Sequence, residues 1–127
     1  MSGKSTLESF YAAMASGNIQ GALELIDDEA VWVESEGFIY AGTYHGPDAV
    51  LEGVFARLGG EWDGFAAIPD HIIGEGDRAV AIGTYSGTYK ATGNSMSARY
   101  AHSIVARDGK IVSFEQVVDS AQVNLAF

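Results

Sequence analysis

The sequence predicts an α+β fold in which three helices in the first half of the chain precede a long run of mostly antiparallel strands. Apolar residues recur at helical spacing in three segments before residue 60, whereas the later segments are long, apolar and rich in β-branched residues. Glycine-rich turn signals separate these later segments. The chain has 127 residues and no linker or repeat, so we expect residues 1–127 to form a single domain.

The first two helices are predicted from apolar residues that repeat at positions i, i+3, i+4 and i+7. In the first helix these residues are Leu7, Phe10, Tyr11 and Met14. In the second helix they are Ile19, Ala22, Leu23 and Ile26. The Gly17–Asn18 pair between them ends the first helix, and Asn18 can cap the second.

The third helix is expected to begin at Gly46-Pro47-Asp48, because proline suits the first helical position and aspartate suits the positive end of the helix dipole. Gly59–Gly60 is expected to end it. Its apolar stripe consists of Val50 or Leu51, Val54, Phe55 and Leu58.

The remaining segments are predicted to be strands. Residues 30–35, "AVWVES", and residues 37–44, "GFIYAGTY", form a hairpin that turns near Glu36–Gly37. Four longer strands follow the third helix: 64–76, 78–90, 95–107 and 110–121. Because these strands are apolar on both faces, we expect helices to cover one face of the sheet and a partner subunit to cover the other.

The composition excludes several classes of partner and chemistry. Seven basic and 17 acidic residues give a net charge of −10, which argues against nucleic acid and anionic membranes as partners. No apolar run approaches the roughly 18 residues that cross a bilayer, and "MSGKSTLESF" lacks the pattern of a secretion signal. Without cysteine there are no disulfides and no thiolate chemistry, so a cytoplasmic location is expected.

The order of these segments resembles the nuclear transport factor 2-like fold, in particular its SnoaL-like and ketosteroid-isomerase-like branch. The stretches that carry the resemblance are "SFYAAMASGNIQGALELIDDEAVWVES", "YHGPDAVLEGVF", "GTYSGTY" and "VARDGKIVSFEQVVD", which together span nearly the whole chain. The resemblance implies a curved, cone-shaped, cystatin-like sheet wrapped by helices, with an apolar pocket inside and a homodimer across the outer sheet face. It says less about the reaction, because this fold hosts isomerases, cyclases, epoxide hydrolases and non-enzymes.

Glu34 is the first candidate catalytic residue. In the steroid isomerases the general base follows the second helix, and "DDEAVWVES" places Glu34 at that position by resemblance. A carboxylate at the mouth of an apolar pocket loses hydration, so its pKa rises and it becomes a better proton acceptor near neutral pH. The alternative is a solvated strand-end carboxylate beside Glu36.

His102 is the second candidate catalytic residue. The resemblance places it where the steroid isomerases hold the protonated acid of the oxyanion hole and where polyketide cyclases hold a pocket histidine. A histidine there could donate a hydrogen bond to an enolate or carry a proton. The alternative is a core histidine that is bonded to a neighbouring tyrosine or to a backbone carbonyl.

Tyr11 and Gln116 complete the polar candidates. Tyr11 lies one residue beyond the position of the oxyanion tyrosine in the steroid isomerases, which falls on Phe10, so it could equally belong to the core. Gln116 stands where SnoaL-like cyclases carry a catalytic aspartate; it cannot take a proton at neutral pH, but it can bind a carbonyl or water. Asp119 should face the opposite side of its strand and is interpreted as structural.

Further side chains are expected to line the pocket and contact the substrate: Trp32, Phe55, Tyr100, Phe114 and Val118, with Gln116. His45, His71 and His102 lack the local spacing of a metal site, so no metal and no cofactor are expected.

The leading hypothesis is therefore a pocket for a hydrophobic, carbonyl-bearing small molecule, in which Glu34 transfers a proton next to the carbonyl, as in an isomerase or a polyketide cyclase. The second is a binding module without catalysis, which the missing acid at Gln116 favours. The third is a structural dimerisation domain. A cavity between Glu34, His102 and Gln116 would favour the first two over the third.

Overall fold

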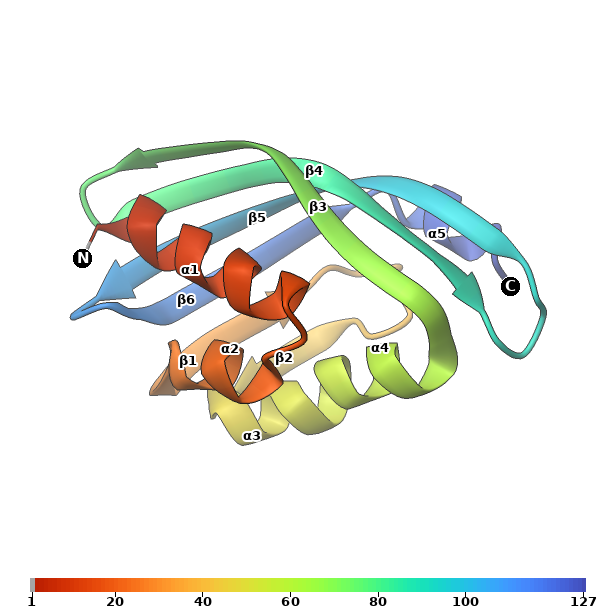
Figure 1. The fold of residues 1–127 in the computed structure, drawn as a ribbon, viewed down its shortest axis with the longest axis horizontal. Helices are drawn as coiled ribbons and strands as arrows, with labels where there is room; N and C mark the ends of the chain where they lie inside the picture. Colours follow the sequence, from red (N-terminus) through yellow and green to blue (C-terminus); the bar gives the residue numbers. More distant parts are fainter. Residues whose placement is uncertain (1) are drawn as a thin grey trace.

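The computed structural model describes residues 2–127, with helices mainly in the first half of the chain and a curved sheet in the rest (Figure 1). The helical elements are α1 (Gly3–Ala15), α2 (Ile19–Glu24), α3 (Gly46–Val50), a π-helical turn (Leu51–Phe55), α4 (Ala56–Glu61) and α5 (Ser120–Asn124). The strands are β1 (Ile26–Glu34), β2 (Gly42–His45), β3 (Trp62–Glu75), β4 (Arg78–Tyr89), β5 (Ser95–Arg107) and β6 (Lys110–Val118).

The six strands form one sheet in the order β2-β1-β6-β5-β4-β3. Every neighbouring pair is antiparallel except β1 and β6, which run parallel. Pro69 lies in β3, which is an edge strand, so its missing N–H removes no central hydrogen bond. The predicted α+β class with a mostly antiparallel, curved sheet is thus confirmed.

The first two helices begin at side-chain caps. The hydroxyl of Ser2 accepts a hydrogen bond from the Ser5 N–H, and the side chain of Asn18 accepts one from the Gly21 N–H, as predicted for the second helix. Ile26, which was expected in the second helix, instead begins β1. It pairs there with Ile111 of β6, so tertiary strand pairing overrides the helical spacing.

The third helix begins at Gly46, as predicted, but it ends later than expected. It passes through the π-helical turn and includes Gly59 and Gly60, neither of which takes a positive φ that would stop it. The helix ends at Glu61, and the buried Trp62 turns the backbone into β3 with φ −123° and ψ 148°. The third strand therefore begins two residues earlier than expected.

The predicted strand over residues 37–44 is mostly a loop. Only Gly42–His45 pairs with β1, and residues 35–41 form successive turns that bury Phe38 and Tyr40. The Tyr40 hydroxyl donates to Glu61 at 2.7 Å and accepts from the Trp62 indole at 3.0 Å. These hydrogen bonds fix the loop against the end of α4, which a hairpin at Glu36–Gly37 would not allow.

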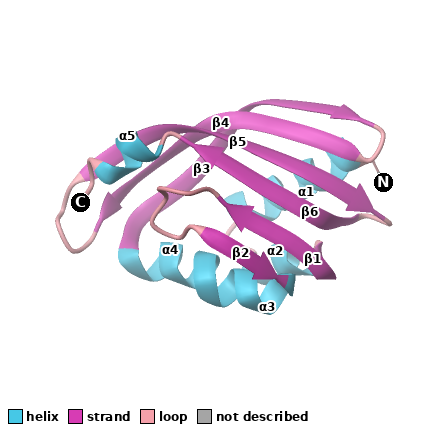
Figure 2. Ribbon diagram, turned by 180° about the vertical axis from the view of Figure 1, so that it is seen from behind, coloured by secondary structure: helices cyan, strands magenta, loops and turns pink. Residues whose placement is uncertain are grey.

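The two faces of the sheet differ sharply. Burial alternates along β4, β5 and β6, as expected for strands with one face on the core. α1 crosses the inner face in Figure 1, and the view from behind in Figure 2 shows most of β4, β5 and β6 uncovered, with the short α5 near one end of β5. The short α5, which the sequence reading missed, follows β6 and is capped by the exposed Asp119. Within residues 2–127, no helix is both long and apolar enough to cross a membrane.

Candidate functional site

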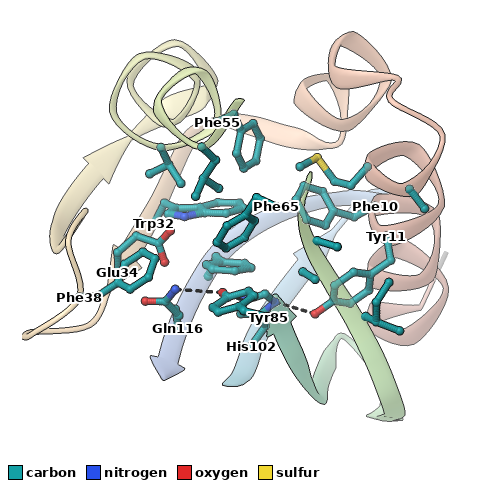
Figure 3. A pocket seen from close by; sticks show the side chains of 18 residues that line it. Phe10, Tyr11, Trp32, Glu34, Phe38, Phe55, Phe65, Tyr85, His102 and Gln116 are labelled. Atoms are coloured by element: carbon teal, nitrogen blue, oxygen red, sulfur yellow. Dashed lines mark hydrogen bonds between the residues drawn. The ribbon is translucent and has the colours of Figure 1, made fainter. Parts of the chain in front are cut away.

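A cavity of about 260 Å³ lies between the inner face of the sheet and the helices (Figure 3). Residues from α1, the π-helical turn, α4 and five of the six strands line it, β2 being the exception. This volume lies just below the usual range for small-molecule sites, roughly 300–1,000 Å³.

Six apolar aromatic side chains line the cavity: Phe10, Trp32, Phe38, Phe55, Phe65 and Phe114. The parallel register of β1 and β6 sets Trp32 beside Phe114, and their rings stack with centroids 3.6 Å apart at 6°. Phe55, from the π-helical turn, meets Trp32 edge-on at 5.8 Å. These flat, apolar surfaces suit a planar hydrophobic ligand.

Glu34 lies in this wall as a buried carboxyl group. Strand alternation turns Trp32 and Glu34 inward and leaves Val31 exposed on the other face. Glu34 is only 5% exposed, and its Oε2 atom has no hydrogen-bond partner. Burial raises its pKa to about 8, with the nearby Trp32 indole opposing the rise. The carboxyl group is therefore mostly protonated at pH 7 and ready to ionise just above it.

The polar side chains that line the cavity, Glu34, Gln116, Tyr85, His102 and Tyr11, form what we call the polar wall. Within it, His102 lies between two tyrosines. Its Nδ1 atom lies 2.5 Å from the Tyr11 hydroxyl, and its Nε2 atom lies 2.5 Å from the Tyr85 hydroxyl. Burial lowers the pKa of His102 to about 3, so the imidazole is neutral at pH 7. Both ring nitrogens are bonded to protein groups, as expected for a core histidine that is bonded to neighbouring tyrosines. The ring nevertheless also lines the cavity.

Gln116 links His102 and its two tyrosines to the loop after β1. It lies opposite His102 in the β5–β6 pairing and is 1% exposed. Its Nε2 atom donates to the Tyr85 hydroxyl at 2.9 Å, and its Oε1 atom accepts from the Ser35 N–H at 3.1 Å. The amide therefore forms the start of a continuous hydrogen-bonded chain through Tyr85 and His102 to Tyr11 (Figure 3).

Two predicted substrate contacts do not line the cavity, namely Tyr100 and Val118. The Tyr100 ring is covered by Tyr85 and His102, with centroids 4.3 and 4.2 Å away. Its hydroxyl lies instead against the backbone of β4 at Gly83, where a Cβ atom would approach it to 2.6 Å. Val118 is the last residue of β6 and lies beyond the cavity.

A match to a known family identifies the chain. The family model of the SnoaL-like domain matches residues 7–114, which is most of the sequence. The chain belongs to the SnoaL-like domain family. No curated protein matches it.

Solved structures agree with this SnoaL-like assignment. An NTF2-like protein from Burkholderia thailandensis E264 is 37% identical, covers 99% of this chain and 97% of its own, and has a TM-score of 0.95. TerC, co-crystallised with polyporic acid, is 26% identical over 98% of this chain and 96% of its own, with a TM-score of 0.86. A protein from Catenulispora acidiphila DSM 44928 with a ketosteroid-isomerase-like fold, in complex with trimethylamine, is 17% identical over 88% of this chain and 83% of its own; its TM-score of 0.76 shows the fold alone.

Sequence reasoning missed Tyr85, the central member of the polar chain of this SnoaL-like protein. A signal for it exists, because Ala79, Ala81 and Gly83 alternate along β4 toward Tyr85 and mark the inner face. Phe38 was also missed as a wall residue, because its segment was predicted to be a strand.

The charges of the site restrict its chemistry. Among residues 2–127, no lysine or arginine lines the cavity, and no group of three or more potential metal-ligating side chains occurs. With Glu34 and His102 both mostly neutral at pH 7, the wall offers hydrogen bonds rather than a countercharge. Such a site favours an uncharged ligand with a polar oxygen over an anion.

Proposed function

We propose that this SnoaL-like protein binds a hydrophobic, carbonyl-bearing small molecule and catalyses proton transfer at the carbon next to the carbonyl. One observation carries the proposal: the Glu34 carboxyl is buried in an aromatic cavity with an unpartnered oxygen and a pKa of about 8. A proton acceptor whose pKa lies near the working pH is the most effective general base. Leaving such a group without a partner costs stability, which is expected where a ligand completes the site.

The proposed reaction requires only proton movements. The ionised form of Glu34 removes a proton from the carbon next to the carbonyl, and the C–H electron pair forms the carbon–carbon double bond of an enolate. The hydroxyl of Tyr11, which is held by His102, stabilises the negative charge on the oxygen. If the proton on Glu34 is first replaced from the solvent, its return to the same carbon gives exchange, and its return to a conjugated carbon gives isomerisation.

The similarity to TerC supports a small-molecule ligand. TerC is 26% identical to this chain along nearly its whole length and was co-crystallised with polyporic acid. Its likeness, together with the cavity of about 260 Å³, favours the two pocket hypotheses over a purely structural dimerisation domain.

Hydrogen–deuterium exchange of a model ketone tests the proposal. With 1-tetralone in D₂O, followed by proton NMR, the wild-type protein should accelerate exchange next to the carbonyl. Glu34→Gln should lower the protein-catalysed rate by a factor of about 10²–10⁴, the usual contribution of a general base. Glu36→Gln, which alters an exposed carboxylate two residues away, is the matched control and should leave the rate unchanged. Equal exchange in the wild type and in Glu34→Gln would eliminate Glu34 as the base.

A binding module without catalysis is the second candidate. It is favoured by Gln116, because both ends of this amide are hydrogen-bonded to the protein and it cannot act as an acid or a base. Saturable binding of 1-tetralone without any exchange above the buffer rate would support this alternative and contradict the enzyme.

We further propose that a second copy of the chain covers the outer face of the sheet. Ile82, Ala101 and Val117 form a cross-strand row there, and Ile82 and Val117 are 39% and 59% exposed. Water-exposed aliphatic side chains in such a row are typical of a homodimer interface. Light scattering after gel filtration should give twice the chain mass, and Ile82→Glu should give the single-chain mass. A monomeric wild type would refute the dimer.

A further inference from the structure

We propose that Gln116 orients the buried hydrogen-bonded chain so that His102 carries its proton on Nδ1 and the hydroxyl hydrogen of Tyr11 remains available to the ligand. Gln116 is then a positioning residue, because it acts through Tyr85 and His102. The tautomer of His102 is independent of any reaction, whereas the role given to Tyr11 rests on the proposed function.

The direction of the Gln116 amide is fixed at its outer end. The backbone N–H of Ser35 lies 3.1 Å from Oε1, and a backbone N–H can only donate. The amide oxygen must therefore face Ser35, and the amide nitrogen must face the Tyr85 hydroxyl, 2.9 Å away. Since an amide NH₂ group can only donate, the Tyr85 oxygen accepts this hydrogen bond.

The Tyr85 hydroxyl passes this direction to the histidine. It has one hydrogen of its own, and its second partner is Nε2 of His102 at 2.5 Å. If Nε2 carried a hydrogen and donated, the Tyr85 hydrogen would lack an acceptor, since no third group within residues 2–127 bonds this hydroxyl. In the opposite arrangement the remaining hydrogen belongs to Tyr11, which has the Tyr100 hydroxyl beside it as an acceptor. A buried donor without a partner is costly, so Tyr85 donates and Nε2 accepts.

The neutral imidazole transmits the direction to Tyr11. A neutral histidine has one donor and one acceptor nitrogen, so a proton-free Nε2 places the hydrogen on Nδ1. Nδ1 then donates to the Tyr11 oxygen at 2.5 Å, and the hydrogen of Tyr11 is not used by His102. Tyr11 lines the cavity, so this hydrogen can reach a ligand oxygen. In the unliganded protein the neighbouring Tyr100 hydroxyl, which is buried and has no other partner among residues 2–127, is the acceptor for this hydrogen, and a ligand oxygen would replace it.

This polarity predicts the chemical class of the ligand group at the Tyr11 end. A wall that donates selects a hydrogen-bond acceptor such as a carbonyl oxygen, and it gives no advantage to a hydrocarbon of the same shape. With the opposite polarity, Tyr11 would donate to His102 and could offer the ligand only an acceptor.

Nitrogen-15 NMR of the unliganded protein tests the tautomer directly. Long-range proton–nitrogen spectra at pH 7 should show His102 with a protonated Nδ1 and an unprotonated Nε2. The other two histidines, His45 and His71, are exposed and can be assigned by substitution. An Nε2-protonated His102 in the wild type would overturn the proposal without any variant being made.

Two variants test the part that Gln116 plays. Gln116→Leu should move His102 toward a mixture of tautomers, because Tyr85 is no longer forced to donate. Ser35→Ala is the control: it removes the hydroxyl 3.3 Å from Oε1 but keeps the backbone N–H, so the tautomer should stay unchanged. If Gln116→Leu does not fold, Tyr85→Phe removes the donor to Nε2, and the Nε2 resonance should shift. An unaltered His102 spectrum in the folded variant contradicts the role of Gln116.

Binding of a matched probe pair tests the role of Tyr11. Chemical-shift titrations should show 1-tetralone binding about threefold to tenfold more tightly than tetralin, the range of one added hydrogen bond. Tyr11→Phe should abolish this preference, whereas Tyr100→Phe should retain it. A preference that Tyr11→Phe keeps would overturn the role of Tyr11. The predicted tautomer without any ketone preference would instead refute the carbonyl ligand of the proposed function and leave the role of Gln116 intact.

Discussion

Glu34 and His102, two buried side chains of the polar wall, differ in whether hydrogen bonds to the protein compensate for their loss of hydration. The same loss of hydration raises the pKa of Glu34 to about 8 and lowers that of His102 to about 3. Desolvation disfavours whichever form is charged, so both groups are driven toward neutrality at pH 7. In this respect the two residues are equivalent.

Their hydrogen bonding is not equivalent. Both nitrogens of His102 are bonded to tyrosine hydroxyls, whereas the Oε2 atom of Glu34 has no partner. A neutral, fully bonded histidine holds other groups in place, and a carboxyl group with an open oxygen can take a new partner or a proton. Under the proposed function, His102 therefore holds its neighbours in place and Glu34 carries out the proton transfer. The charge of Glu34 still reaches Tyr85, whose pKa is raised first by burial and then by this carboxylate.

The largest expected effect is on the pH dependence of stability. Because the pKa of Glu34 rises from 4.5 to about 8 on folding, the folded state holds a proton that the unfolded chain has released between these values. The wild type should lose stability relative to Glu34→Gln as pH rises through this window, by about 1.4 kcal/mol per pH unit and about 5 kcal/mol in all. Urea unfolding from pH 4.5 to 8.5 measures the difference.

Glu36→Gln provides the baseline for this difference. Its carboxylate is exposed on the loop after β1, so its difference curve from the wild type should be nearly flat. A flat curve for Glu34→Gln as well would mean that the Glu34 carboxyl is solvated, and the contrast with His102 would disappear.

Replacing His102 should lower the free energy of unfolding, whereas Glu34→Gln should raise it relative to the wild type at high pH. His102→Leu leaves the hydroxyls of Tyr11 and Tyr85 without their shared partner in a buried site. Tyr85 keeps the hydrogen bond that it accepts from Gln116, but its own hydrogen loses its acceptor, and the Tyr11 hydroxyl loses its hydrogen bond to His102. Two such losses should lower the free energy of unfolding by about 4 kcal/mol. The measurement is urea unfolding at pH 7, with His71→Leu on the exposed face of β3 as control, where a change within about 0.5 kcal/mol is expected. A loss as small as that of the control would show that the hydrogen bonds of His102 to the two tyrosines do not stabilise the folded protein.

The elements that local patterns specify were predictable from the sequence. Asn18 as a cap and Gly46-Pro47 as a helix start depend on a few adjacent residues, and both occur as expected. The predictions for Ile26 and for residues 37–44 were wrong because both conformations depend on residues far away in the sequence. Ile26 pairs with Ile111, and the loop is held by Glu61 and Trp62. Non-local pairing of this kind leaves no trace in local spacing.

The candidate site shows the same division. Strand alternation and the family resemblance were enough to bring Glu34, His102 and Gln116 to one cavity. They could not reveal that Tyr85 joins the last two, because that contact requires the register of three strands. Nor could they separate Tyr100 from the cavity wall, since its ring faces inward but is covered by its neighbours.

The smallest expected effect is the change that a bound ligand causes in the pKa values of Glu34 and His102. Carbon-13 NMR of the Glu34 side-chain carboxyl should show a midpoint near pH 8 in the unliganded protein. Saturating 1-tetralone should raise this pKa further, because the ligand displaces water from the carboxyl group. His102 should show no titration between pH 5 and 8 with or without the ligand, since burial keeps its pKa near 3. A ligand that shifts His102 and leaves Glu34 unchanged would place the chemistry at the opposite end of the cavity.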